Sequence, residues 1–182
     1  TRRRNRANGR VGERTASGLL LEVEQSFGNC PKYIQPRRAV FDPGRPSHAP
    51  VDEKYGLSDA ERAWIRGADT FFIASAHPED NGDPAHGVDV SHRGGPPGFI
   101  TVDGDTLGID DFAGNNYFNT LGNLLLNPRA GLLFTDFARG GLLHLDVDAR
   151  ILPGTPRRLL LRVTKVRHRP AALPLRWETA AD

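Results

Sequence analysis

The sequence lacks several features, and most of these absences exclude a class of protein. It has one cysteine, Cys30, which excludes a disulfide scaffold and a thiolate metal cluster within one chain. Its apolar runs are only a few residues long, so we expect no membrane-spanning helix. No apolar stretch follows the first arginines, so no secretory signal is recognised and a cytoplasmic location is predicted. Methionine is absent, so we expect that residue 1 is not the translational start.

What is present describes an ordinary folded domain with an uneven charge distribution. The chain has 182 residues, of which 38% are hydrophobic and 25% charged, a balance typical of one globular domain with its own core. The net charge of +2 hides basic ends, 1–38 and 150–182, and an acidic middle. Arg2, Arg3, Arg4 and Arg6 could bind nucleic acid, but only the ends are basic, so a solvated strand or tail is favoured.

Short strands dominate the pattern. Alternating or β-branched residues predict strands at 15–27, 70–77, 88–92, 99–102, 106–110, 130–137, 142–152 and 157–168. Ser58 and Glu61 form a capping-box signature before a short helix at 59–67. An apolar stripe predicts a second helix at 116–126, and five prolines predict a loop at 28–50. The fold class is therefore mainly β with minor α, in a closed or nearly closed antiparallel barrel.

The first candidate site is the start of the second helix. Asn115, Asn116, Asn119 and Thr120 are neutral, and no Asp or Glu lies in this first turn. A helix start carries unpaired N–H groups and a partial positive charge, so this one suits a phosphate. Taken alone, the simpler interpretation is favoured, in which Asn115 or Asn116 caps the helix and the other polar side chains are solvated.

The second candidate is the strand and glycine-rich turn at 88–99. Asp89, Ser91 and Arg93 alternate and therefore share one face of the strand. Arg93 can bind a phosphate with two nitrogens, and glycines 94, 95 and 98 allow the backbone to approach a ligand. A wide connection with an exposed Arg93 explains the pattern equally well.

Other chemistry is less well supported. Lys32 and Tyr33 are expected to line a neighbouring pocket, and Cys30 has no nearby histidine to activate it. Histidines 77, 86 and 92 have the spacing H-x8-H-x5-H, which matches no zinc pattern, so no metal site is predicted. The chain has no G-x-S-x-G elbow and no phosphate loop ending in GK[ST].

Five motifs in order resemble one known family. They are NCPKYIQPR, ADTFFIASAH, DVSHRGGPPGF, GNNYFNTLGNLL and NPRAGLLFTDF. Together they resemble the flavin-nucleotide-binding proteins related to pyridoxamine 5'-phosphate oxidase, over roughly residues 15–178. The resemblance implies a six-stranded antiparallel split β-barrel with Greek-key elements, here at 58–182, preceded by a strand and Pro-rich loop at 15–57. Residues 1–14 would be the last strand of a preceding repeat or a basic tail, and the whole protein would include a preceding barrel or a reductase domain.

The same resemblance implies a homodimer with FMN sites between the subunits. The strand Val88, Asp89, Val90 and Ser91 would lie along the flavin ring and ribityl chain, and Asn116, Asn119 and Thr120 would hold the ribityl and phosphate groups. In pyridoxamine 5'-phosphate oxidase itself the positions aligned with Asn119 and Thr120 are basic, so Arg93 or the helix dipole would supply the charge here. Arg176 and Trp177 would approach the cofactor from the C-terminal segment, and the candidate cofactor-binding set also includes Lys32, Asn115 and Asn123.

The implied activity is that of an FMN-dependent oxidoreductase acting on a small molecule. The pattern names no catalytic residue and no substrate, and membrane or nucleic-acid partners are not expected. Two alternatives remain open. One is a non-catalytic flavin-binding or redox-sensing module, and the other is a split barrel that holds deazaflavin or haem instead of FMN.

Overall fold

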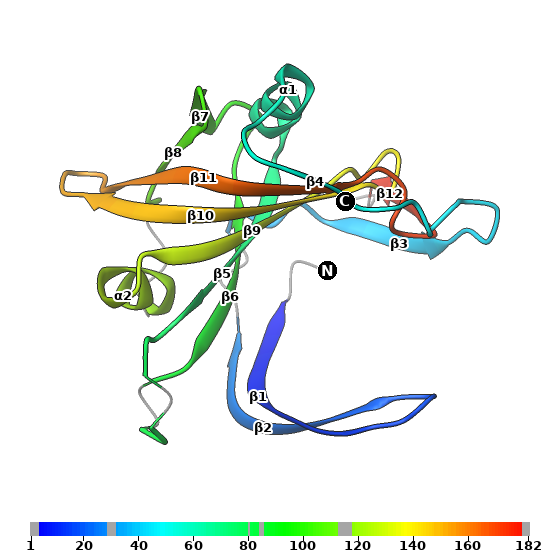
Figure 1. Ribbon diagram of the computed structural model, residues 1–182, viewed down its shortest axis with the longest axis horizontal. Coiled ribbons are helices and arrows are strands. Elements are labelled where there is room, and N and C mark those ends of the chain that lie inside the picture. The colour runs from blue at the N-terminus through cyan, green and yellow to red at the C-terminus, as the bar shows by residue number, and fades with distance from the viewer. Residues whose placement is uncertain (1–3, 29–31, 80, 84–85, 113–117, 180–182) are drawn as a thin grey trace.

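The structure is a computed structural model that describes residues 4–28, 32–79, 81–83, 86–112 and 118–179. The chain is mostly β, as the sequence predicts, and its strands pair antiparallel throughout (Figure 1). In the described part of the chain, no helix is long and apolar enough to cross a membrane.

One large antiparallel sheet forms the body of the molecule. Its strands run in the order β6-β5-β9-β10-β11-β8-β7, and β4 pairs with β11 beside this path. The chain leaves β6, crosses to the far edge for the β7–β8 hairpin and returns with β9 beside β5. The sheet therefore has eight strands where six are expected. The strand bounds are β4 Asp52–Lys54, β5 Thr70–Ala76, β6 Val88–Gly94, β7 Ile100–Asp103, β8 Thr106–Asp110, β9 Arg129–Thr135, β10 Leu142–Leu152 and β11 Arg158–Arg169.

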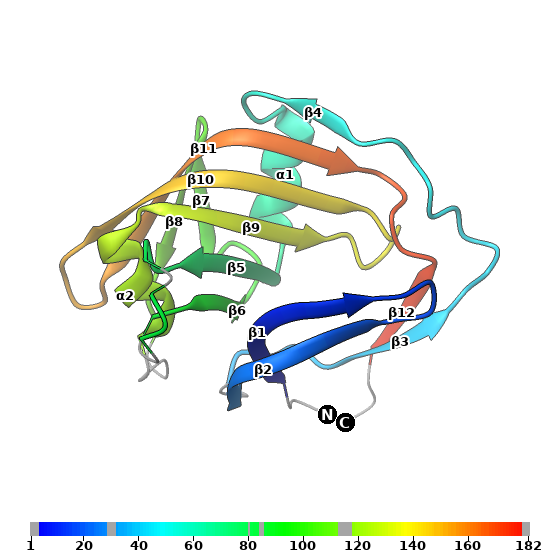
Figure 2. The same cartoon turned by 60° about the horizontal axis from the view of Figure 1, so that its bottom comes forward.

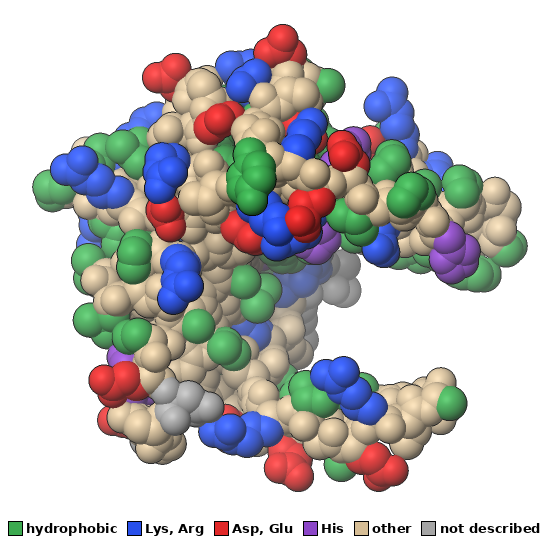
Figure 3. Space-filling view, viewed as in Figure 1, with side chains coloured by type: hydrophobic (Ala, Val, Ile, Leu, Met, Phe, Trp, Pro, Cys, Tyr) green, Lys and Arg blue, Asp and Glu red, His purple; other side chains and the backbone are tan. Residues whose placement is uncertain are grey.

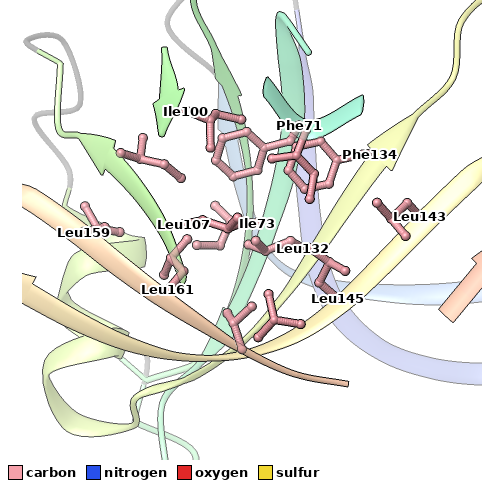
Figure 4. Packing of buried hydrophobic residues seen from close by; sticks show 14 of the residues in the cluster. Phe71, Ile73, Ile100, Leu107, Leu132, Phe134, Leu143, Leu145, Leu159 and Leu161 are labelled. Carbon is pink, nitrogen blue, oxygen red and sulfur yellow. The ribbon is translucent and has the colours of Figure 1, made fainter. Parts of the chain in front are cut away.

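The core lies on the concave side of this bent sheet. Figure 4 shows side chains from β5, β7, β8, β9, β10 and β11 converging on one another. Phe71 stacks on Phe134 with ring centroids 5.3 Å apart, and both rings are almost fully buried. The alternation predicted from the sequence produces this core, because every second residue of each strand points inward.

Two helices close the ends of the core. α1 spans Asp59–Gly67 and begins with the predicted capping box, in which Ser58 and Glu61 bond each other's backbone. α2 spans Asn119–Leu126 and begins later than predicted. Its N-cap is Phe118, so the predicted cap by Asn115 or Asn116 is wrong. Both asparagines lie outside the described residues.

Two smaller sheets project from the body. β1 (Asn5–Arg14) and β2 (Leu19–Gly28) form a hairpin, so Arg6 lies in a paired strand. β3 (Arg37–Phe41) and β12 (Leu175–Thr179) form the second pair, and β3 falls in the segment predicted as a loop. Figures 1 and 2 show the hairpin curving away from the main sheet. Figure 3 shows an open gap between the hairpin and the β3 arm.

Candidate functional site

Strand β6 carries the predicted site residues on one face, as the alternation indicates. Asp89 is 1% exposed, and Ser91 and Arg93 are partly buried on the same side. Val88 and Val90 point the other way, with exposed fractions of 52% and 47%. Because β6 is an edge strand, its outer carbonyls need partners. Arg6 and Asn8 of β1 supply them by donating to Val90 O (3.2 Å) and Val88 O (2.7 Å).

Asp89 links three elements through its buried carboxylate. Thr120 of α2 donates its hydroxyl to Asp89 Oδ2 at 2.5 Å, and Ser91 donates to the same oxygen at 2.9 Å. Arg6 of β1 forms an ion pair with Oδ1. Thr120 is 1% exposed, so its side chain does not face the surface. Its hydrogen bond to Asp89 joins α2 to β6.

A second charged group lies at the end of β6. Arg93 Nη1 lies 3.5 Å from Asp111 Oδ1, and Arg157 donates to Asp111 Oδ2 at 3.0 and 3.3 Å. Burial lowers the pKa of Arg93, while the carboxylates of Asp111 and Asp89 act in the opposite direction. Arg93 Nη2 is buried and has no hydrogen-bond partner among the described residues. A guanidinium donor left in this state is costly unless a ligand satisfies it.

No residue of α2 itself compensates the partial positive charge at the start of the helix. Phe118 adopts a left-handed conformation (φ 53°) and provides no side-chain cap, and the first turn has no acidic residue. The Arg157 guanidinium lies 4.9 Å from the centre of the Phe118 ring. This contact connects the charged residues around Arg93 to the start of α2. Asn119 lies in the first turn, where it was predicted to be.

Two of the three glycines in the glycine-rich turn lie against other parts of the chain. A Cβ on Gly94 would lie 2.2 Å from Tyr33 O, and a Cβ on Gly95 would lie 2.6 Å from the Phe99 ring. These two glycines therefore allow close packing within the chain itself. Gly98 has a φ of +92° in the turn before β7.

The remaining predicted residues fall in three places. Lys32 lies 5.3 Å from the centre of the Tyr33 ring, which packs at 5.4 Å on Phe112, next to Asp111. Asn123 donates to Ser75 Oγ (3.3 Å) and Gly87 O (3.2 Å), so its amide ties α2 to the sheet. Arg176 and Trp177 lie in β12, in a separate sheet from β6.

Trp177 contacts a residue that lines a hollow away from β6. Its ring meets Phe137 edge-on at 5.4 Å, and Phe137 lines a hollow of about 370 Å³ between α1, β5 and β9. Two of the charged groups that line this hollow pair with each other, since Arg37 stacks on Phe137 at 3.9 Å and bonds Asp69 at 2.5 Å.

The sequence reasoning missed three residues of the charged site: Arg6, Asp111 and Arg157. Arg6 was interpreted as part of a solvated strand or tail, and nothing in its local sequence points to a carboxylate 83 positions away. Asp111 directly follows β8 and Arg157 directly precedes β11, so only the β8–β11 pairing brings them together.

The histidines form no metal site in the described part of the chain. His77 and His86 stack with ring centroids 3.5 Å apart, and each uses its Nδ1 within its own turn. His92 packs on Phe72 on the opposite face of β6. Burial, together with Arg4, Arg93 and Arg37, lowers the pKa of His92 to about 4.

Comparisons with known proteins give structural similarities only. No family model matches the chain, and no curated protein matches its sequence. Among solved structures, a HupZ variant from Group A Streptococcus has a TM-score of 0.46 at 12% identity, covering 61% of this chain and 98% of its own. A proposed pyridoxamine 5'-phosphate oxidase from Corynebacterium glutamicum has a TM-score of 0.41 at 12% identity, covering 69% and 98%. The FAD-binding protein from Mycobacterium smegmatis has a TM-score of 0.42 at 13% identity, covering 66% and 98%.

One of these three structures is named as a protein of the family that the five motifs resemble. At identities of 12–13% and TM-scores below 0.5, these similarities assign neither a ligand nor an activity to it.

Proposed function

We propose that this chain binds FMN in a site framed by β6, the start of α2 and the Asp111–Arg157 pair. The observation that carries the proposal is the buried Arg93 Nη2, which has no hydrogen-bond partner in the described part of the chain. A phosphate is the ligand group that a guanidinium binds best, because its oxygens accept two parallel hydrogen bonds.

The local charges favour an anion. Three guanidinium groups, on Arg6, Arg93 and Arg157, face the carboxylates of Asp89 and Asp111. One positive charge is left over, and the uncapped start of α2 adds to it. The residues present therefore fit a phosphate monoester. Thr120 and Asp89 would support the site from beneath, because both are buried and bonded to each other.

The chain's own residues would bind and orient the cofactor. Arg93 and the N–H groups at the start of α2 would hold the phosphate, and Asn119 and Ser91 would face the ribityl chain. A bound flavin supplies hydride or electron-pair transfer, so an oxidoreductase acting on a small molecule is the proposed activity. No side chain is assigned as acid or base.

Exposed apolar side chains support a homodimer. Val88 and Val90 lie exposed on the outer face of β6, and the hairpin exposes Val11, Leu19, Leu20, Leu21 and Val23. Large apolar side chains exposed together on neighbouring elements are typical of an interface with another chain. We expect light scattering to give the mass of a dimer, with Leu19→Glu/Val23→Glu shifting it to a monomer. A wild-type monomer at micromolar concentration would contradict this part of the proposal.

The binding test replaces the unpartnered guanidinium. We expect Arg93→Met to weaken FMN at least 10-fold in a flavin-fluorescence titration, because the phosphate loses its buried cation. Arg162→Met is the matched control, since Arg162 pairs with Asp148 and its side chain is 64% exposed. Equal FMN affinity in the two variants would refute the phosphate assignment.

The activity has its own test. FMN-loaded protein should oxidise NADH or NADPH faster than free FMN when an electron acceptor is present. Turnover equal to that of free FMN would remove the oxidoreductase part and leave a flavin-binding module.

A further inference from the structure

The ion pair between Arg6 and Asp89 joins the β1–β2 hairpin to β6 and is almost completely buried. The Arg6 side chain is 10% exposed and that of Asp89 is 2% exposed. Arg6 also donates to Ser91 Oγ at 3.0 Å and lies over the Phe27 ring at 4.6 Å, so its guanidinium is held from several sides. The pair joins a residue of the hairpin to the strand that carries the candidate phosphate site.

We propose that Arg6 is a specificity-determining residue of this site: by neutralising Asp89, it allows the site to accept a phosphate. This inference rests on the proposed function. Arg6 acts through Asp89, so its effect falls on the charged end of the ligand, and the flavin ring is not involved.

The position of Asp89 is the first step. Its carboxylate bonds the hydroxyl of Thr120, the second residue of α2, and therefore lies beside the helix start. It also acts electrostatically on Arg93, the proposed phosphate ligand. A negative charge at this point repels a phosphate. It also offsets part of the positive potential with which Arg93 would attract the phosphate.

The hydroxyls around Asp89 cannot remove that charge. A carboxylate only accepts hydrogen bonds, so Thr120 and Ser91 must both donate their protons to it. Each hydroxyl has then spent its proton and cannot donate to a phosphate. Arg6 is the one cation that the structure pairs with Asp89 among the described residues. Without it, the group of Asp89, Arg93, Asp111 and Arg157 has no surplus positive charge.

A comparison of FMN with riboflavin isolates this effect. The two ligands share the ring and the ribityl chain, and only FMN carries the phosphate. Riboflavin affinity therefore reports any structural damage, and the ratio of the two dissociation constants reports the charge at the phosphate site. Both are measured by flavin-fluorescence titration of the full chain.

Four variants complete the design. Arg6→Gln removes the cation, Asp89→Asn removes the carboxylate with little change in shape, and the double variant removes both. Arg10→Gln is the matched control, because Arg10 lies on the same strand but pairs with Glu24 at 3.0 Å on the surface.

We expect Arg6→Gln to reduce the preference for FMN over riboflavin about 10-fold, which corresponds to about 1.4 kcal/mol. Adding Asp89→Asn should restore the preference to within about threefold of wild type, and Arg10→Gln should not change it. Equal weakening of FMN and riboflavin binding in Arg6→Gln, or no recovery in the double variant, overturns the role assigned to Arg6 and leaves the proposed function standing. Wild-type protein that binds neither ligand overturns the proposed function and this assignment with it.

Discussion

The bond from Thr120 to Asp89 allows a quantitative test of how the site is held together. Thr120→Val keeps the shape of the side chain and removes the hydroxyl that donates to the buried carboxylate at 2.5 Å. A hydrogen bond to a charged group contributes about 1.5–3 kcal/mol, and here the acceptor is left buried with one donor fewer. We therefore expect the free energy of unfolding to fall by about 2 kcal/mol.

Urea denaturation at pH 7 measures this change, with Thr164→Val as the matched control. Thr164 donates to a neutral acceptor, Asp146 O, at 3.1 Å, so its loss should cost about 1 kcal/mol. In an Asp89→Asn background the acceptor is neutral, so Thr120→Val should also lower the free energy of unfolding by about 1 kcal/mol. If Thr120→Val lowers the free energy of unfolding no more than Thr164→Val in the wild-type background, the charged hydrogen bond between α2 and β6 does not contribute as described.

Two further predictions concern stability. The lowered pKa of His92, about 4 against 6.5, means that the unfolded chain binds the proton first. The unfolding free energy should therefore fall as pH drops from 6.5 to 4, by on the order of 1–2 kcal/mol after allowing for partial exposure, and His92→Gln should remove this part of the pH dependence. Phe134→Ala should cost about 3–5 kcal/mol in urea denaturation because it opens a cavity in the core, whereas Phe41→Ala, at a ring 67% exposed, should cost well under 1 kcal/mol. Equal costs for the two would contradict the assignment of the core.

Most of the fold could be predicted from the sequence, because the alternation of apolar residues and the residues that form caps and turns act locally. The alternation in 70–77 and 142–152 marks β5 and β10, and the Ser58–Glu61 signature marks the start of α1. β3 and β12 carry no such pattern. Each is stabilised by pairing with the other across more than a hundred residues, which local propensity does not encode.

The candidate site shows the same division. Alternation correctly placed Asp89, Ser91 and Arg93 on one face of β6. It could not show that Asp89 and Thr120 are buried against each other, because that depends on how α2 docks on the sheet. The pairing of Arg6 with Asp89 depends on the hairpin folding back along an edge strand, so the basic segment was interpreted by its charge alone.

The visible absorption spectrum of the purified protein tests the central claim most directly, when it is recorded before and after denaturation and filtration. The account predicts a yellow protein with two flavin bands and FMN recovered in the filtrate, or a colourless protein that acquires these bands when FMN is added. Protein that remains colourless and takes up no added FMN would contradict the proposed site at β6 and α2.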